Sequence, residues 1–142
     1  MATHETASAQ ETEALGARLA ATLEPGDVVL ISGELGAGKT TFVRGAARAL
    51  GVQTPVTSPT FTIGQRYPAS APVGCVSHID LYRLRSIADE DPDLLADYVG
   101  ADTIAFIEWP AVAEHELGEL GHVRFRVQLN HAGGDARTIQ IT

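Results

Sequence analysis

The sequence is poor in cysteine and in basic residues, and it has no long run of hydrophobic residues. Cys75 is the single cysteine among 142 residues, so an internal disulfide is excluded, and its apolar setting in VGCVSH favours a buried free thiol. No stretch approaches the ~18 consecutive apolar residues of a membrane-spanning helix. The polar, acidic N-terminus MATHETASAQETE is unlike a secretory signal. We therefore expect a cytoplasmic protein that binds no membrane.

Acidic residues outnumber basic ones, with 18 Asp and Glu against 10 Lys and Arg, and the formal net charge is −8. Proteins that bind nucleic acid unaided usually carry a basic patch, because neutralisation of phosphate dominates their affinity. The sequence predicts no binding of DNA, and contact with RNA only within an assembly. The chain has no internal repeat, and its length and hydrophobic content favour one domain over residues 1–142, with 1–7 expected to be a disordered tail.

The most specific motif is GELGAGKT at 33–40, which matches G-x-x-x-x-G-K-[ST] without a mismatch. Glycines let backbone N–H groups curl around an anion, and the following helix directs its positive dipole end at the same phosphates. Lys39 is expected to reach the β- and γ-phosphates, and the Thr40 hydroxyl to bind Mg²⁺. The alternative is a glycine-rich turn that merely joins a strand to a helix.

The flanking sequence has the periodicity that a phosphate-binding loop requires. The β-branched run at 27–32 predicts a strand before the loop, and apolar residues at helical spacing over 39–50 predict a helix that Gly51 ends. Ser8 and Glu11 have capping-box spacing, and leucines that recur as far as residue 23 predict a first helix ending at Pro25.

Downstream patterns extend the predicted sheet. In chain order they predict a loop over 51–59, a hairpin of strands at 60–67 and 73–79, one or two short helices in 86–100, a buried strand at 103–107 and a C-terminal hairpin of 123–129 with 136–142. The segment HELGELG at 115–121 lacks zinc-ligand spacing and is predicted to be solvated surface. Together these elements predict an α/β P-loop NTPase fold, a mixed sheet with a parallel core and antiparallel hairpin extensions.

Two carboxylates follow apolar strands, Asp80 after VSHI and Glu108 after IAFI. Nucleotide sites in such folds lie at the carboxyl ends of strands, and an acid there is the Walker B pattern that holds Mg²⁺ directly or through water. The alternative is that each acid caps a strand end in solvent. Ser58 and Thr60 lie where a loop hydroxyl in nucleotide switches senses the γ-phosphate, although an S-P-T segment is also a common turn.

Four motifs in this order and spacing, LGAGKTT at 35–41, SPTF at 58–61, HIDLYRL at 78–84 and EWP at 108–110, resemble the TsaE family, formerly called YjeE, of bacterial tRNA threonylcarbamoyladenosine biosynthesis proteins. The resemblance implies a slow ATPase, converting ATP to ADP and phosphate, that supports repeated turnover of a complex of two partner proteins, TsaB and TsaD. It implies contact with tRNA only indirectly, through that complex.

The resemblance also implies residue roles that agree with the motif. It places phosphates on 36–41, Mg²⁺ on Thr40 and Glu108, hydrolysis on Asp80 and a switch-like loop at 58–61. It places Trp109 beside the site, whereas a lone tryptophan by itself favours core or interface. Gly134 stands where an arginine often follows the first glycine of the family's hairpin, which weakens any role of Arg137 at the nucleotide. The predicted catalytic residues are Lys39, Asp80 and Glu108; the nucleotide-binding residues are Gly33, Leu35, Gly36, Ala37, Gly38, Lys39, Thr40, Thr41, Ser58, Thr60 and Trp109; the metal ligands are Thr40 and Glu108.

Two other functions stay open on the sequence. A small-molecule kinase also uses a P-loop, and Arg83 and Arg85 are candidates for its lid, but only about 40 residues separate the loop from Asp80, which leaves little room for an acceptor domain. A nucleotide-gated binding module would hold ATP or GTP with negligible turnover. The chain lacks an N-K-x-D segment, which disfavours guanine specificity.

Overall fold

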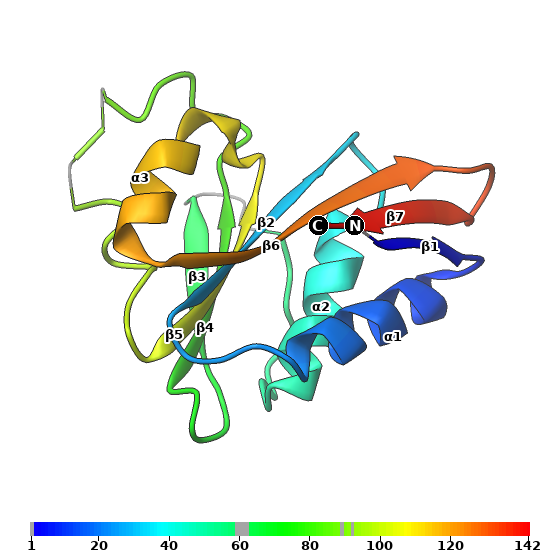
Figure 1. Cartoon of the computed structure of the whole chain (residues 1–142), viewed down its shortest axis with the longest axis horizontal. Coiled ribbons are helices and arrows are strands. Elements are labelled where there is room, and N and C mark those ends of the chain that lie inside the picture. Colours follow the sequence, from blue (N-terminus) through cyan, green and yellow to red (C-terminus); the bar gives the residue numbers. More distant parts are fainter. Residues whose placement is uncertain (1, 59–62, 89, 92) are drawn as a thin grey trace.

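The computed structural model describes residues 2–142 except 59–62, 89 and 92. Its strands form one seven-stranded sheet in the order β1-β7-β6-β2-β5-β4-β3 (Figure 1). The strands are β1 Ala2–Thr6, β2 Asp27–Gly33, β3 Gly64–Pro68, β4 Cys75–Asp80, β5 Thr103–Glu108, β6 His122–His131 and β7 Arg137–Ile141. The helices are α1 Ala9–Ala20, α2 Lys39–Ala49 and α3 Glu114–Leu120, with a 3₁₀ helix, η1, at Pro110–Val112.

The middle of the sheet is parallel and both of its edges are antiparallel. Strand β2 pairs in parallel with β5 and with β6, and β5 pairs in parallel with β4. Strand β3 adds to one edge, and β7 and then β1 add to the other, all antiparallel to their neighbours. This confirms the predicted mixed sheet with a parallel core.

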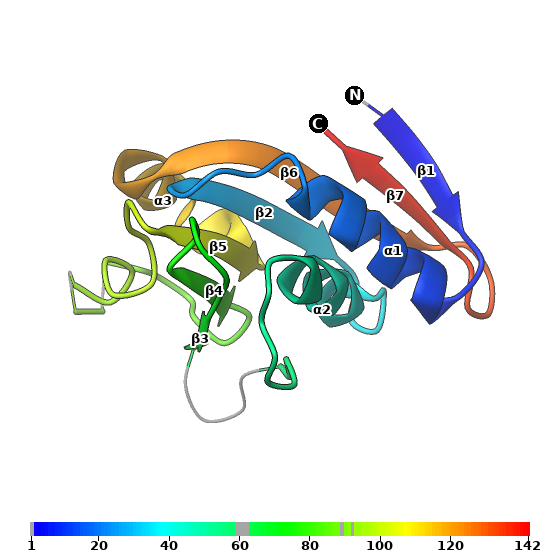
Figure 2. The same cartoon turned by 90° about the horizontal axis from the view of Figure 1, so that it is seen from below.

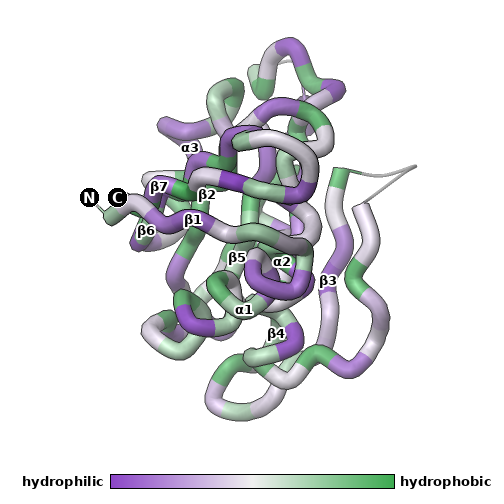
Figure 3. Tube along the Cα trace, turned by 90° about the vertical axis from the view of Figure 1, so that its right-hand side faces the viewer, coloured by the Kyte–Doolittle hydropathy of each residue, from purple (hydrophilic) through white to green (hydrophobic). Residues whose placement is uncertain are grey.

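Hydrophobic cores cover both faces of β2, which explains its continuous apolar sequence. Val29 and Ile31 pack with α1 and α2, which lie together on one side of the sheet in Figure 2. Val28 and Leu30 pack on the other face with residues of the 81–99 segment and of α3. The trace of α1 carries both hydrophilic and hydrophobic residues in Figure 3, and its buried residues recur at helical spacing, as expected for a helix with one buried face.

Helix α1 begins as its capping box predicts. The Ser8 hydroxyl accepts a hydrogen bond from the Glu11 N–H at 3.2 Å, and the Glu11 carboxylate accepts one from the Ala7 N–H at 3.3 Å. The helix ends at Ala20, earlier than the leucine pattern suggests. Leu15 and Leu19 are buried against α2 and the sheet, as their spacing predicts.

Glycines let α1 and α2 approach closely. A Cβ atom on Gly45 would lie 2.0 Å from the Glu13 carbonyl oxygen, and one on Gly16 would lie 2.3 Å from the Phe42 carbonyl oxygen. Both contacts are with backbone, so neither can be relieved by a side-chain rotation.

We therefore expect Gly45→Ala to lower the free energy of unfolding by more than about 2 kcal/mol, because the helices must separate. Gly118→Ala is the matched control: it is also helical, nothing lies within 4 Å of its Cβ position, and alanine there should stabilise by up to about 1 kcal/mol. Urea unfolding measures both. Equal stability of Gly45→Ala and the parent would show that the helices do not pack this closely.

Three expectations differ from the structure. The disordered tail is wrong for residues 2–6, which form β1 and pair with β7 from Ala2↔Ile141 to Thr6↔Arg137. Only Thr6 of this strand is buried, so no hydrophobic alternation marks it. The solvated-surface prediction for 115–121 is wrong in part, because residues 115–120 lie in α3 and its Leu117 is fully buried.

The third difference is in 86–100, where the described residues form turns rather than the one or two helices predicted. The side chains of Ser86 and Asp91 accept hydrogen bonds from the N–H groups of Ala88 and Asp93, two residues on. Such local bonds compete with a helix. Within the described ranges, no helix is long and apolar enough to cross a membrane.

Candidate functional site

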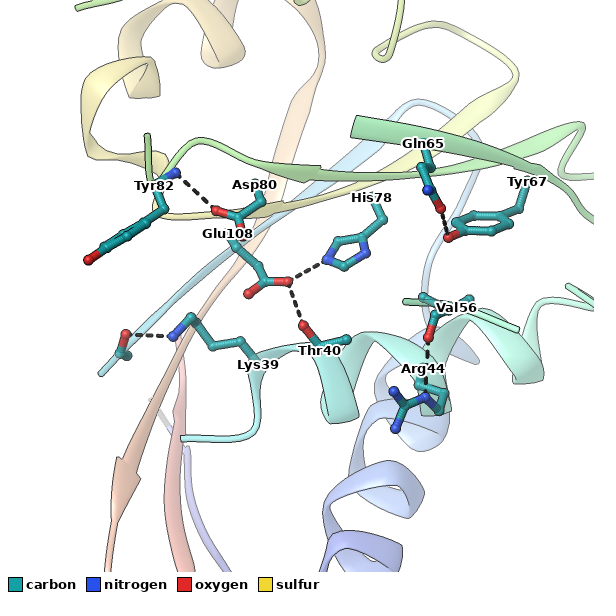
Figure 4. Close-up of polar contacts among 11 residues, drawn as sticks. Lys39, Thr40, Arg44, Val56, Gln65, Tyr67, His78, Asp80, Tyr82 and Glu108 are labelled. Atoms are coloured by element: carbon teal, nitrogen blue, oxygen red, sulfur yellow. Dashed lines mark hydrogen bonds and ion pairs between the residues drawn. The ribbon is translucent and has the colours of Figure 1, made fainter. Parts of the chain in front are cut away.

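The sheet brings separate sequence motifs to one edge. Ile31 of β2 pairs with Glu108 of β5, and Glu108 pairs with Asp80 of β4. Because these strands are parallel, their carboxyl ends meet beside the loop that leads from β2 into α2. Asp80 and Glu108, the two carboxylates predicted at the ends of different strands, are therefore neighbours at this loop (Figure 4).

The loop at 33–38 depends on glycine. Gly38 stands immediately before α2 with φ of 99°, in the left-handed region that residues with a Cβ rarely adopt. A Cβ on Gly33 would lie 2.5 Å from the Leu129 carbonyl oxygen of β6. The glycines of the motif therefore serve both the turn and the close packing of its first strand.

Lys39 is buried and folded back over its own loop. Its Nζ donates to the carbonyl oxygens of Gly33 and Glu34 at 2.7 and 2.8 Å, and it lies 4.6 Å from the centroid of the Trp109 ring. The pKa of Lys39 is lowered, because the effect of burial outweighs that of the negative charges of Glu108 and Asp80, which raise it. The ammonium group is thus held by neutral carbonyl groups that phosphate oxygens can replace.

Glu108 is only 3% exposed, and two side chains meet one of its oxygens. The Thr40 hydroxyl donates to Glu108 Oε2 at 3.1 Å, and Nε2 of the fully buried His78 is in hydrogen-bond contact with the same oxygen (Figure 4). Mg²⁺ prefers oxygen ligands and commonly takes one or two protein groups together with phosphate and water. The converging hydroxyl and carboxylate fit that requirement.

Asp80 is less constrained than Glu108. One of its carboxylate oxygens accepts a hydrogen bond from the Tyr82 N–H at 2.9 Å. Burial raises the pKa of Asp80, the Tyr82 hydrogen bond lowers it, and the charge of Glu108 raises it further. A carboxylate with a raised pKa at the edge of a cavity is suited to accept a proton.

Trp109 joins Lys39 and Tyr82 at the mouth of the site. Its φ is 56°, a left-handed conformation that is strained for a bulky residue, and its N–H donates to the Ile31 carbonyl at 3.1 Å. The Trp109 and Tyr82 rings are 5.0 Å apart between centroids. The tryptophan thus lies beside the loop lysine rather than in the core.

A cavity of about 310 Å³ collects most of the predicted site. The described residues that line it all belong to the predicted set: Leu35, Gly36, Gly38, Lys39, Thr40, Thr41, Ser58, Asp80, Glu108 and Trp109. Ala37 is fully buried and Gly33 contributes a carbonyl to Lys39, and neither lines the cavity. Thr60 lies outside the described residues.

The contacts of two residues in this region, His78 and Arg137, are not predicted by the sequence. The motif HIDLYRL assigns no role to His78, although a histidine inside an apolar strand pattern is itself a signal of a buried polar contact. For Arg137 the sequence predicts at most a weak role at the nucleotide. The structure places its guanidinium against the loop, where it donates to the carbonyls of Gly36 and Ala37, and Arg137 is not among the described residues that line the cavity.

A strand, a glycine-rich loop with Lys and Thr, a helix, and acids at the ends of neighbouring parallel strands define a P-loop protein of the α/β class. Residues 6–139 match the family model for threonylcarbamoyl adenosine biosynthesis protein TsaE. The chain belongs to the TsaE family.

Individual relatives agree with this assignment. The chain is 44% identical to the tRNA threonylcarbamoyladenosine biosynthesis protein TsaE of Streptomyces coelicolor, over 85% of this chain and 80% of that protein. It is 38% identical to the protein of the same name from Bacillus subtilis, over 96% and 82%. The crystal structure of Bacillus subtilis YdiB superposes with a TM-score of 0.73 at 31% identity and covers 99% of this chain and 83% of that one.

Proposed function

We propose that this chain binds ATP with Mg²⁺ and hydrolyses it to ADP and phosphate in the cytoplasm, as a subunit of the machinery that makes threonylcarbamoyladenosine in tRNA. Its ATPase activity would support multiple turnover of a complex of TsaB and TsaD, and it would meet tRNA only through that complex. The observation that carries the proposal is the convergence of Lys39, Thr40, Asp80 and Glu108 on one cavity. The TsaE names of the relatives support the pathway.

In the proposed complex the phosphates lie in the loop at the start of α2. Lys39 exchanges the carbonyls of Gly33 and Glu34 for β- and γ-phosphate oxygens. The Thr40 hydroxyl and the Glu108 carboxylate would hold Mg²⁺, which when bound would supply positive charge beside the phosphates. His78 keeps the Glu108 carboxylate in place through Oε2.

For hydrolysis, Asp80 orients a water molecule and accepts its proton as the water oxygen bonds to the γ-phosphorus. The bridging P–O bond breaks, and ADP and phosphate leave. Phosphoryl transfer is accelerated strongly by an arginine that stabilises the developing charge. None of the described residues that line the cavity is an arginine. This supports a slow rate for the isolated chain and a faster one when a partner completes the site.

Reconstitution tests the proposal against both alternatives. With TsaB, TsaD, tRNA and the other substrates, we expect more than one modified tRNA per TsaD only when this chain and hydrolysable ATP are present. The variant Glu108→Ala should stop after about one turnover. Transfer of phosphate to a small metabolite would instead favour the kinase, and full turnover with Glu108→Ala would favour a passive nucleotide-gated module.

Trp109 provides a direct signal of binding. Because it is the only tryptophan and the Lys39 ammonium lies over its ring, Mg-ATP should change its emission as Lys39 moves to the phosphates. A fluorescence titration measures this, and Trp109→Phe, which should still bind in calorimetry, is the control. Unchanged emission while calorimetry reports binding would place the nucleotide away from Trp109.

A further inference from the structure

Every backbone carbonyl of the phosphate-binding loop accepts a hydrogen bond. The carbonyls of Gly33 and Glu34 accept from Lys39 Nζ, and that of Gly38 accepts from the Phe42 N–H at 2.9 Å. The three carbonyls between them, at 35–37, are bound by side chains of the β6–β7 hairpin, which lies beside the connection from β2 to α2 in Figure 1. The loop is therefore held from two directions.

Arg137 makes most of the contacts between the β6–β7 hairpin and the loop. Its Nε donates to the Ala37 carbonyl at 3.0 Å and one Nη donates to the Gly36 carbonyl at 3.1 Å. Its other Nη donates to the carbonyls of Gly134 and Ala136 at 2.7 and 2.8 Å, which ties the guanidinium to its own hairpin. His131 of the same hairpin adds a contact from Nε2 to the Leu35 carbonyl at 3.3 Å.

The bound carbonyls fix where the amide groups point. In a planar trans peptide the C=O and N–H point in opposite directions, so binding the Ala37 carbonyl on one side turns the Gly38 N–H to the other. Among the described residues, the N–H groups of Gly38, Lys39 and Thr40 donate to no carbonyl. These amides stand at the start of α2, where unpaired N–H groups bind anions.

Lys39 and Arg137, which make most of the side-chain contacts with the loop, respond differently to nucleotide binding. Lys39 must leave its carbonyls if it is to reach the phosphates. Arg137 is not among the described residues that line the cavity, so it can keep its four hydrogen bonds when the cavity is filled. A guanidinium suits this task because its planar fork carries five donors at fixed angles, whereas a lysine offers one point charge.

We propose that Arg137 is the positioning residue of the phosphate-binding loop, holding the Gly36 and Ala37 carbonyls so that the loop amides stay directed at the phosphates when Lys39 moves. This inference rests on the proposed nucleotide function, and it assigns Arg137 no contact with the nucleotide itself. It predicts a loss of affinity for ADP as well as ATP, since both place phosphates on these amides.

The test compares Arg137→Met, which keeps the aliphatic stem, with Arg137→Lys and with the control Arg126→Met. Arg126 lies on the neighbouring strand β6 and pairs with Glu114. Calorimetry with Mg-ADP and Mg-ATP should show about tenfold to hundredfold weaker binding for Arg137→Met, a smaller loss for Arg137→Lys, and no change for Arg126→Met. Thermal unfolding of each variant shows whether it is folded.

Amide hydrogen exchange of the nucleotide-free protein separates this inference from the proposed function. Exchange over residues 35–40 should accelerate in Arg137→Met while β2 and α1 stay protected, whether or not the protein binds nucleotide. Parent protein that binds no nucleotide would overturn the proposed function, and unaltered exchange in 35–40 would independently overturn the role of Arg137. The role of Arg137 would also be overturned if Arg137→Met exchanged faster over residues 35–40 but bound nucleotide as tightly as the parent, because the conformation of the loop would then not affect binding.

Discussion

Replacing Lys39 with alanine is expected to weaken binding of Mg-ATP by about a hundredfold, or about 3 kcal/mol. Lys39 is the only lysine of the chain, and its ammonium group lies in the cavity beside Thr40 and Glu108. The expected loss of binding free energy is large because the substitution removes charge-assisted hydrogen bonds between a buried ammonium group and phosphate. Calorimetry with Mg-ATP measures the change.

Arg48→Ala is the control for this substitution. It removes a cation from the same helix, but the Arg48 side chain is 68% exposed and pairs with Glu13, away from the cavity. Its affinity for Mg-ATP should equal that of the parent. If Lys39→Ala binds as tightly as Arg48→Ala, the loop is not a phosphate site.

Replacing Asp80 is expected to separate hydrolysis from binding. Asp80→Ala and the isosteric Asp80→Asn should bind Mg-ATP within about threefold of the parent, while hydrolysis falls about 10² to 10⁴-fold, the usual contribution of a general base. Among the described residues, the hydrogen bonds of Lys39 and Thr40 are made with Gly33, Glu34 and Glu108 rather than with Asp80, so loss of Asp80 should leave the phosphate ligands in place. Equal losses of binding and hydrolysis would make Asp80 a structural or metal-binding residue.

The raised pKa of Asp80 gives this role a pH signature. The base must be deprotonated to accept a proton, and burial raises its pKa, so hydrolysis should be lost on acidification at a higher pH than an ordinary aspartate would give. Activity should be full above that pKa and fall as the pH drops through it. The residual activity of Asp80→Asn should not show this decrease at acidic pH. The same decrease in the variant would show that a group other than Asp80 titrates.

The site was predictable where local sequence fixes both conformation and chemistry. The glycines of the motif at 33–40 indicate the backbone conformation of the loop. The continuous apolar sequences of β2 and β5 indicate strands buried on both faces. Because β4 and β5 are parallel neighbours, the acids at their carboxyl ends meet at one edge of the sheet. Asp80 and Glu108 were therefore foreseeable as neighbours, although their pairing register was not.

The rest depends on contacts between distant parts of the chain. Strand β1 carries almost no buried side chain and is fixed by backbone pairing with β7, so hydrophobic periodicity does not reveal it. The position of Arg137 follows from the strand order, which brings residues 100 and 101 positions apart into contact. His78 meets Glu108 only because β4 and β5 pair. A single sequence carries no signal of these distances.

Phosphate release from Mg-ATP by the purified chain, alone and with TsaB, TsaD and tRNA, is the measurement that tests the central claim most directly. We expect a low rate for the chain alone, a higher rate with the partners, and loss of both with Lys39→Ala. Phosphate release by the parent that is undetectable in every mixture, or that is equal in Lys39→Ala, would contradict an ATPase centred on this loop.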